Sequence, residues 1–302
     1  MTTTGPTAAI VAKKHPVDDL LRADRLPHIL CPGCGIGTTM HCYLEALVES
    51  GVHVDKHVCV SGIGCSGRTA GYVKVDSYHS THGRALPFAL GIAVYRPELT
   101  VTVISGDGDL SSIGGNHLIH AARRNVNMTV ICINNFNYGM TGGQAGPTTP
   151  MTAKSGTTPY GVADKPFNLP HLVNAVGANF VARWSVLHAR QLKDSILRGM
   201  RKPGFAFIEV LSPCPTGFGR PNDVGEGIEE MLKYHRRCKW DDKARLEDVD
   251  IDMLRPDSPV IVGNFVDRDR PAFCPATGAP PASPTGATEE STKERAAMKD
   301  AH

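Results

Sequence analysis

Four short runs of apolar, β-branched residues, separated by stretches of helical periodicity, constrain the fold of this chain most strongly. Such runs are typical of buried strands, and they are His57–Ser61, Val101–Ser105, Met128–Ile133 and Ala206–Leu211. The helical stretches are Thr38–Ser50, Arg84–Tyr95, Asn116–Arg124, Leu169–Val176 and Val186–Met200. This alternation predicts an α/β fold in which a parallel sheet carries helices on both faces. Ligands of such sheets bind at the carboxyl ends of the strands.

Composition divides the chain into four regions. Residues 30–220 contain all the predicted strands and form the expected central domain, preceded by an N-terminal extension, residues 1–29. Residues 221–275 are expected to form a helical and irregular C-terminal extension, in which Glu226–Trp240 is one amphipathic helix. The remaining residues, 276–302, are rich in Pro, Ala, Thr, Ser and charges, a composition that predicts a disordered tail.

Two further local expectations concern the first helix and a long loop. Thr38 is a plausible N-cap and Gly51 a plausible C-cap of the first predicted helix. The segment Thr141–Pro170 is rich in Gly, Thr and Pro and has no period. A loop of that length in a compact domain is usually functional, so we expect it to cover a site.

Charge and cysteine usage exclude several classes of protein. The 32 basic and 30 acidic residues nearly cancel, which argues against nucleic acid or an anionic membrane as the main partner. The sequence contains neither an apolar run long enough to span a membrane nor a signal-peptide core, so we expect a cytoplasmic protein. Nine cysteines are an odd number, and in a reducing compartment they are core thiols, catalytic thiols or metal ligands.

The first constellation with chemical meaning follows two predicted strands. Ser105-Gly106-Asp107-Gly108-Asp109 comes directly after one strand, and Asn134-Asn135 directly after the next, with 25 residues between Gly108 and Asn134. Glycines let a ligand approach the backbone closely, and carboxylate and amide oxygens suit Mg²⁺ and its phosphates. Either turn alone is ordinary, but the pair at adjacent strand ends indicates a phosphate and magnesium site.

This pairing resembles the thiamine diphosphate motif, in which GDG is followed by NN after 25 to 30 residues. The resemblance implies that Mg²⁺ is held by the side chains of Asp107 and Asn135 and the backbone carbonyl of Asn137. It also implies that Asp109, Gly139 and Met140 lie along the diphosphate.

A second constellation consists of four cysteines. Cys31 and Cys34 form a CPGC motif, whereas Cys65 and Cys214 each follow a predicted strand at the sheet edge that carries the diphosphate motif. Four convergent thiolates suit either zinc or a [4Fe–4S] cluster, and spacing alone does not choose between them. The other cysteines are interpreted as small buried or incidental side chains: Cys42, Cys59, Cys132, Cys238 and Cys274.

Taken in order, the motifs CPGCG, SGIGCSGR, THGRA, GDGD, NYGMTGGQ and SPCPT resemble those of the β subunits of 2-oxoacid:ferredoxin oxidoreductases. The variants CPGCGIG, HSTHGRALPFA and MTGGQAGPTTP look most like the 2-oxoglutarate branch. The resemblance runs from about Leu30 to Arg220, and no function is carried to residues outside it. It implies a thiamine diphosphate-binding domain with thiamine diphosphate, Mg²⁺ and one [4Fe–4S] cluster held by Cys31, Cys34, Cys65 and Cys214.

The resemblance also supplies site residues that composition does not single out. His82 in THGRA is implied as a catalytic cofactor contact, whereas Arg68 and Arg84 are weaker candidates for anion contacts. The implied cofactor-binding residues are Ile63, Gly64, Cys65, Ser66, His82, Gly106, Gly108, Asp109, Asn135, Gly139, Met140 and Thr141.

The family's activity is reversible, coenzyme A-dependent oxidative decarboxylation of 2-oxoglutarate to succinyl-CoA and CO₂, with electrons passing through the cluster to ferredoxin. Run in reverse, it is the carboxylation used in the reductive tricarboxylic acid cycle. The chain has no room for the pyrimidine-binding domain of thiamine enzymes. An α subunit is therefore expected to supply that domain and its activating glutamate, in a heterodimer doubled to an (αβ)₂ heterotetramer.

Three alternatives remain open from the sequence. The same chemistry could act on pyruvate or other 2-oxoacids. The chain could be a non-redox thiamine diphosphate decarboxylase or synthase with a structural zinc. It could also be a non-catalytic iron–sulfur electron-transfer subunit in which GDG and NN are ordinary turns.

Overall fold

The computed structural model describes residues 15–225, 227–241, 243–255 and 259–273. The predicted disordered tail and the first half of the predicted N-terminal extension therefore lie outside the described residues. The division into four regions stays a prediction.

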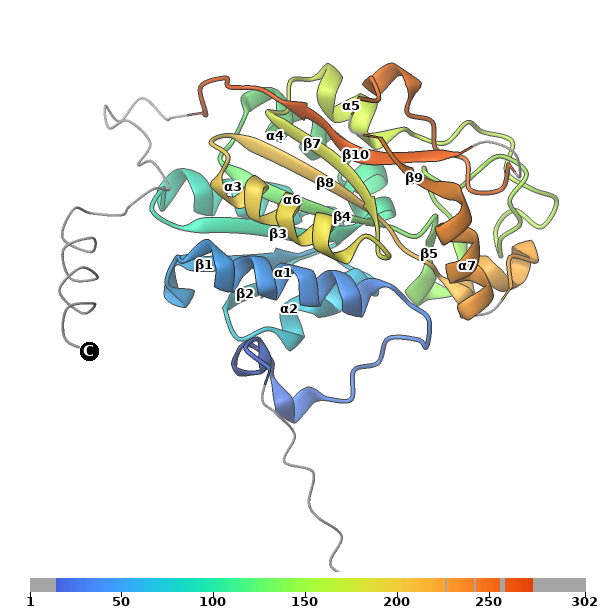
Figure 1. Ribbon diagram of the computed structural model, residues 1–302, viewed down its shortest axis with the longest axis horizontal. Helices are drawn as coiled ribbons and strands as arrows, with labels where there is room; N and C mark the ends of the chain where they lie inside the picture. Colours follow the sequence, from blue (N-terminus) through green and yellow to red (C-terminus); the bar gives the residue numbers. More distant parts are fainter. Residues whose placement is uncertain (1–14, 226, 242, 256–258, 274–302) are drawn as a thin grey trace, which may run out of the picture.

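In the described part of the chain, an eight-stranded sheet forms the centre of the fold (Figure 1), in the order β2-β1-β3-β4-β8-β7-β10-β9. The strands from β2 to β7 in that order run parallel, whereas β10 runs antiparallel to β7, and β9 is parallel to β10. This confirms the predicted, mostly parallel sheet. In sheet order the strands are Asp76–His79, His57–Ser61, Thr100–Gly106, Met128–Asn134, Phe205–Leu211, Phe180–Ser185, Val260–Asp267 and Cys238–Trp240.

Helices cover both faces of the sheet, as the alternating pattern predicts. On one face lie α1 (Ile36–Ser50) and α6 (Ala189–Arg201), and on the other lie α3 (Ala85–Tyr95), α4 (Gly115–Arg124) and α5 (Leu169–Ala175). Successive side chains of a strand point to opposite faces. In β4, Ile131 and Ile133 accordingly join the core under α1 and α6, whereas Val130 and Cys132 join the core under α3, α4 and α5.

The shorter elements lie at the edges of this sandwich. They are α2 (Thr69–Tyr72), α7 (Ile228–Arg237) and a small antiparallel hairpin of β5 (Asn137–Tyr138) and β6 (Gln144–Ala145). None of the helices in the described residues combines the length and apolar character that crossing a membrane requires.

Both ends of α1 test the sequence expectations. The prediction of Thr38 as N-cap is wrong, because the helix begins at Ile36 with Gly35 as its N-cap residue. A side chain at position 35 would collide with Val186, since an added Cβ would lie 2.4 Å from its Cγ1, so the CPGC turn runs into the helix without a side-chain cap. Gly51 is confirmed as the C-cap, with φ of +72°.

The predicted helices keep their places but their ends shift by one to three residues, and two regions differ from the prediction in kind. The helix predicted for Glu226–Trp240 ends at Arg237, because Cys238–Trp240 pair with β10 as strand β9. The turn that follows β3 is helical before α4 begins: Asp109–Ile113 form a π-helical segment, an irregularity frequent at functional sites.

Candidate functional site

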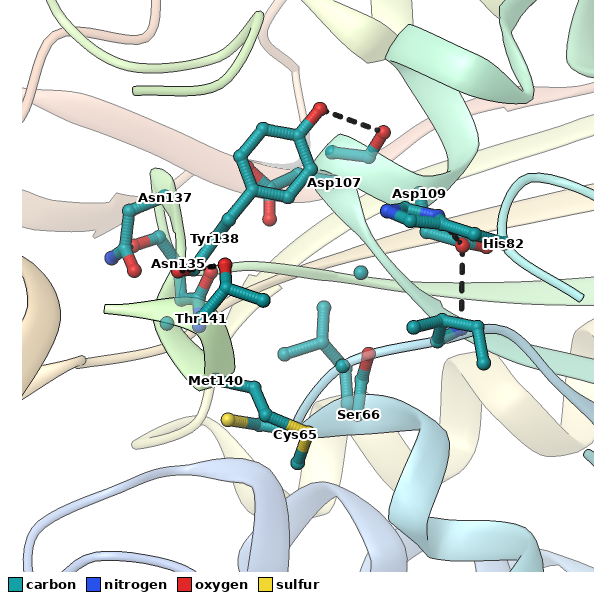
Figure 2. Close-up of a pocket in the computed structure, with 16 residues that line it drawn as sticks. Cys65, Ser66, His82, Asp107, Asp109, Asn135, Asn137, Tyr138, Met140 and Thr141 are labelled. Atoms are coloured by element: carbon teal, nitrogen blue, oxygen red, sulfur yellow. Dashed lines mark hydrogen bonds and ion pairs between the residues drawn. The ribbon is translucent and has the colours of Figure 1, made fainter. Parts of the chain in front are cut away.

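A pocket lies at the carboxyl ends of β1, β3 and β4, where parallel sheets place their ligand sites. It contains about 540 Å³ of empty space, part of which is open to solvent. Every residue predicted to contact the cofactor or magnesium lines this pocket (Figure 2). The lining is Ile63, Gly64, Cys65, Ser66, His82, Gly106, Asp107, Gly108, Asp109, Ile133, Asn135, Asn137, Tyr138, Gly139, Met140 and Thr141.

Asp107, Asn135 and Asn137 bring oxygen atoms together on one side of the pocket. One end atom of the Asn135 side-chain amide lies 3.1 Å from Asp107 Oδ1 and 2.9 Å from the Asn137 carbonyl oxygen. In the structure the amide oxygen takes this place, so three oxygens face one another without a hydrogen between them. If the Asn135 amide is rotated by 180°, its NH₂ group instead donates hydrogen bonds to Asp107 Oδ1 and to the Asn137 carbonyl oxygen. Only a cation or a turned amide relieves the repulsion among these oxygens.

Asp107 is a buried carboxyl group, only 1% exposed. Burial raises the pKa of Asp107 to about 7, although hydrogen bonds lower it in part. One of those bonds comes from the Thr148 hydroxyl, which donates to Oδ2. Thr148 belongs to the long Gly-, Thr- and Pro-rich segment, so that segment packs against the pocket.

Asp109, two residues further along, has a different environment. Its Oδ1 accepts hydrogen bonds from the backbone N–H groups of Gly83 (2.8 Å) and Ile63 (3.2 Å) and contacts Nδ1 of His82. Its Oδ2 accepts from the Ser105 hydroxyl at 2.7 Å. Protein donors therefore occupy both carboxylate oxygens, and Asp109 joins the ends of β1 and β3 to the THGR loop.

Tyr138 is a pocket residue that the sequence did not single out. Its hydroxyl donates to the Gly108 carbonyl oxygen at 3.4 Å, and its ring centroid lies 6.1 Å from that of His82 in an edge arrangement. A Cβ at Gly108 would lie 2.4 Å from Cε1 of Tyr138. The second glycine of the GDG motif thus makes room for an aromatic ring. The available signal was the place of Tyr138 in the NYGMTGGQ motif, three residues after NN.

The four cysteines of the second constellation gather beside the pocket. Burial raises the pKa of Cys34 to about 12, and negative charge on the other three thiols raises it further, so all four groups interact electrostatically. Cys214 Sγ also lies 3.8 Å from Oδ1 of Asn137, the residue whose backbone carbonyl oxygen faces the Asn135 side chain. The other described cysteines are buried in the core, as predicted: Cys42, Cys59, Cys132 and Cys238 are at most 5% exposed. Cys274 lies outside the described residues.

Glu230 on α7 is a second residue that sequence reasoning missed. Its Oε1 accepts a hydrogen bond from the Cys214 backbone N–H at 3.1 Å, and its Oε2 is buried without a hydrogen-bond partner. Burial raises the pKa of Glu230 to about 7. No local pattern distinguishes this glutamate from its exposed neighbours, because only the packing of α7 on the loop after β8 buries it.

The family described as the C-terminal TPP binding domain of thiamine pyrophosphate enzymes matches residues 62–210. This segment contains the whole pocket lining, so fold and site together define a thiamine diphosphate-binding domain.

More specific relatives place the chain within this class. The 2-oxoglutarate synthase subunit KorB of Methanothermobacter marburgensis is 47% identical over 262 residues, covering 87% of this chain and 90% of the relative. KorB of Methanocaldococcus jannaschii is 47% identical over 260 residues, covering 86% and 94%. The structure of 2-oxoglutarate:ferredoxin oxidoreductase from Magnetococcus marinus, with 2-oxoglutarate, coenzyme A and succinyl-CoA bound, matches with a TM-score of 0.74 and 33% identity over 85% of this chain and 86% of that one.

The chain belongs to the family of β subunits of 2-oxoacid:ferredoxin oxidoreductases, and its relatives are those of the 2-oxoglutarate branch. It is thus an enzyme subunit with an oxidoreductase role on 2-oxoacids, and it works with a partner subunit.

Proposed function

We propose that the chain is the β subunit of an enzyme that converts 2-oxoglutarate and coenzyme A to succinyl-CoA and CO₂. Two electrons pass one at a time through a single [4Fe–4S] cluster to two molecules of oxidised ferredoxin. The observation that carries this proposal is the convergence of the GDG, NN and THGR motifs in one pocket with four thiols beside it. Thiamine diphosphate supplies the carbon nucleophile and the electron sink for decarboxylation.

The oxygen trio fits Mg²⁺ in number, type and spacing. Adjacent ligands of an octahedral Mg²⁺ with bonds of about 2.1 Å lie about 3.0 Å apart, and the Asn135 amide lies 3.1 and 2.9 Å from its two oxygen neighbours. We therefore assign Mg²⁺ to Asp107, the Asn135 side chain and the Asn137 carbonyl. The cofactor's diphosphate would lie along Gly106, Gly108, Gly139, Met140 and Thr141, and Ile63, Gly64 and Ser66 would complete the lining around the cofactor.

His82 is the proposed catalytic residue, and Asp109 is assigned the task of orienting it. Because the Asp109 carboxylate engages Nδ1, Nε2 is the nitrogen that His82 offers to a group in the pocket. A carboxylate partner fixes both the tautomer and the ring orientation of a histidine. His82 can then hold or transfer a proton at Nε2 while the ring stays in place.

The geometry of the four cysteines favours a cluster over zinc. Thiolates on one tetrahedral zinc, with Zn–S bonds of about 2.3 Å, lie about 3.8 Å from one another. In the described part of the chain, His15, His41 and Glu45 form the group of three His, Cys, Asp or Glu residues whose ligand atoms all lie within 4.8 Å of one another. No three of the four cysteine sulfurs are therefore that close together. A four-iron cluster binds each cysteine at a separate iron, which suits the wider spacing of Cys31, Cys34, Cys65 and Cys214.

A partner subunit completes the site in this proposal. Large apolar side chains are exposed around the pocket: Met140 on its wall is 45% exposed, and Phe167, in a neighbouring cavity that shares Tyr138, is 49% exposed. Exposed apolar groups near a site are typical of interfaces. We assign this surface to an α subunit that brings the pyrimidine-binding domain and the activating glutamate, in a cytoplasmic (αβ)₂ assembly.

The decisive experiment is anaerobic reduction of methyl viologen by the reconstituted complex, with 2-oxoglutarate or pyruvate and with or without coenzyme A. We expect coenzyme A-dependent reduction with 2-oxoglutarate, much slower reduction with pyruvate, and none by this chain without its partner. Preference for pyruvate would contradict the substrate assignment. A colourless preparation that contains zinc and no iron would contradict the redox assignment altogether.

A further inference from the structure

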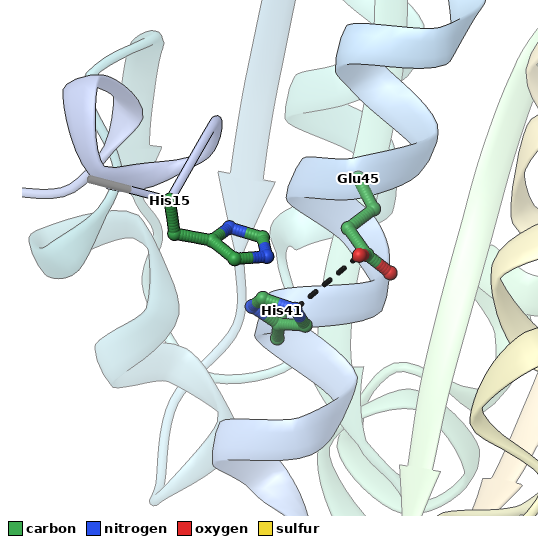
Figure 3. Close-up of side chains that lie close together, drawn as sticks. All are labelled: His15, His41 and Glu45. Carbon is green, nitrogen blue, oxygen red and sulfur yellow. Dashed lines mark ion pairs between the residues drawn. The ribbon is translucent and has the colours of Figure 1, made fainter. Parts of the chain in front are cut away.

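Two histidines and a glutamate meet on the side of α1, remote in sequence from the motifs of the pocket (Figure 3). One potential ligand atom from each of His15, His41 and Glu45 lies within 4.8 Å of the others. The two imidazole rings have centroids 5.0 Å apart at an interplanar angle of 53°, and His41 Nε2 lies 3.5 Å from Glu45 Oε1. We propose that this trio is a binding site for a divalent transition metal, Zn²⁺ in particular.

The ligand set determines the class of metal. Two imidazole nitrogens and one carboxylate suit zinc and its transition-metal neighbours, whereas Mg²⁺ and Ca²⁺ prefer oxygen ligands alone. Ligands on one tetrahedral zinc, with bonds of about 2.0 to 2.1 Å, lie about 3.3 Å apart. The His41–Glu45 pair is already near this separation. His15 is exposed, and His41 and Glu45 are half-buried. His15 Nδ1 accepts a hydrogen bond from the Val17 backbone N–H at 3.3 Å, so Nε2 is the nitrogen that His15 offers to a metal, with water completing the coordination.

The backbone holds these side chains in position before any metal arrives. His41 and Glu45 are four residues apart on α1 and therefore lie on the same face of the helix. His15 is held by the turn that follows it: its backbone N–H donates to Asp18 Oδ2 at 2.8 Å, and Val17, two residues further along, is 2% exposed in the core. Folding has therefore already removed part of the conformational entropy of these residues, so less is lost when a metal binds.

The position of the site gives it a structural consequence. It links the start of the described chain to the middle of α1, so the segment between them becomes a closed loop. That loop contains Cys31 and Cys34, and a bound metal would restrain its ends as a cross-link does. The inference stands on these side chains alone and does not depend on the proposed reaction.

The test is calorimetric titration of ZnCl₂ into the purified complex with its cofactors in place. We expect the wild type to bind one more Zn²⁺ per β chain than the variants His15→Ala and His41→Ala, or to bind it at least tenfold more tightly. Glu45→Gln should weaken binding with little change in side-chain size. His53→Ala is the matched control, because His53 pairs with Asp55 at 3.3 Å on the surface and belongs to no such trio among the described residues.

A second readout is limited proteolysis with trypsin, which can cleave after Arg22 and Arg25 in the closed loop. Zn²⁺ should slow this cleavage in the wild type and in the His53 variant, and not in the His15 or His41 variants. Equal zinc binding by the wild type and both histidine variants would overturn the proposal. Absence of zinc binding by the wild type at micromolar concentrations would overturn it too.

Discussion

Asp107 and Asp109 have identical side chains and are two residues apart, but their carboxylate groups have different surroundings and different proposed roles. Asp109 receives hydrogen bonds from the protein on both oxygens, whereas Asp107 Oδ1 lies 3.1 Å from the end of the Asn135 side-chain amide. The GDGD motif predicted that both contact a cofactor, and in the structure both line the same pocket. It could not separate their tasks, because the donors that surround Asp109 come from the ends of two strands and a loop that only the fold brings together.

The first prediction separates these tasks by experiment. Asp107→Asn removes the charged magnesium ligand, so we expect Mg²⁺-dependent affinity for thiamine diphosphate to fall more than about 100-fold, beyond the effect of changing an indirect partner. Asp109→Asn should keep that affinity within about tenfold and lose turnover, because His82 is no longer held. Calorimetric titration of the cofactor at fixed Mg²⁺ measures both, with cluster absorption as the check on folding. Full cofactor occupancy in Asp107→Asn would contradict the assignment.

A second prediction at this scale concerns His57 at the start of β1. Burial lowers the pKa of His57 to about 4, and its Nδ1 is buried without a partner. The unfolded chain binds this proton near pH 6.5 and the folded chain only near pH 4, so stability present above pH 6.5 is lost as the pH falls toward 4. The contribution is about 2 kcal/mol between pH 7.5 and pH 5.

We expect His57→Leu to lose that part of the pH dependence. Urea unfolding of wild type and variant at pH 7.5 and pH 5 gives the change in the free energy of unfolding with pH for each protein. The difference between these two changes isolates His57, because the other titrating groups contribute equally to both proteins. An unchanged pH dependence in the variant would show that His57 is not the group responsible.

At the scale of elements, a buried polar network joins β7, β8 and β4. Arg183 and Glu209 form an ion pair (2.6 Å) with both side chains fully buried, and Glu209 Oε1 accepts from the Asn134 side chain at 2.7 Å. Oδ1 of Asn134 accepts from the backbone N–H of Phe136 at 3.2 Å. The first asparagine of the NN motif therefore shapes the turn that presents Asn135.

The same network explains why β7 was missed in the sequence. Arg183 interrupts the apolar run Phe180–Ser185, and a lone strand pattern cannot show that a glutamate on β8 neutralises it. Strand β2 was missed for another reason, since it is a fully exposed edge strand without an apolar pattern. The four strands that were predicted are richer in apolar and β-branched residues, and in Ala206–Leu211 such residues flank Glu209 on both sides. Helix positions followed from periodicity, whereas their ends depended on tertiary contacts.

The third prediction concerns Glu209→Gln. This change leaves the Arg183 charge buried without its counterion, a loss that typically costs 3 to 5 kcal/mol. We expect a free energy of unfolding lower by about 3 kcal/mol and weaker thiamine diphosphate binding, because the NN turn loses its support. Denaturant unfolding and cofactor titration measure the two effects. Glu98→Gln, which removes an exposed pair with Arg96, is the control and should change neither; a stable, fully cofactor-competent Glu209→Gln would refute the supporting role.

Across the whole molecule, the four thiols join regions that are distant in sequence. Cys31 and Cys34 precede α1, Cys65 follows β1, and Cys214 follows β8. The sequence predicted that these regions converge, because ends of parallel strands share one edge of the sheet. It did not predict that Glu230 of α7 would be buried against the same loop, since that contact depends on how the C-terminal helix packs.

The fourth prediction tests this convergence. We expect most of the visible cluster absorption to be lost in each single variant, because each proposed ligand binds a separate iron. The variants are Cys31→Ser, Cys34→Ser, Cys65→Ser and Cys214→Ser. Each substitution should also speed proteolysis of the segment up to Cys34, because the proposed cluster would tie that segment to the sheet. Cys59→Ser and Cys132→Ser should keep near wild-type absorption and lose only packing energy. A full four-iron spectrum in Cys214→Ser together with its loss in Cys59→Ser would reject the ligand set.

Asn137 contributes its main-chain carbonyl to the oxygen trio and its side-chain oxygen to the surroundings of Cys214, at 3.8 Å from the sulfur. The proposed Mg²⁺ ligands and the four thiols are thus separated by the covalent bonds of one residue and one long hydrogen bond. In the proposed enzyme, thiamine diphosphate on one side and the cluster on the other would be the two redox centres, and electrons would pass between them without diffusion of either centre or movement of a domain. The transfer rate between the two centres should then be independent of solvent viscosity, and any viscosity dependence of turnover would arise where ferredoxin and substrate meet the complex.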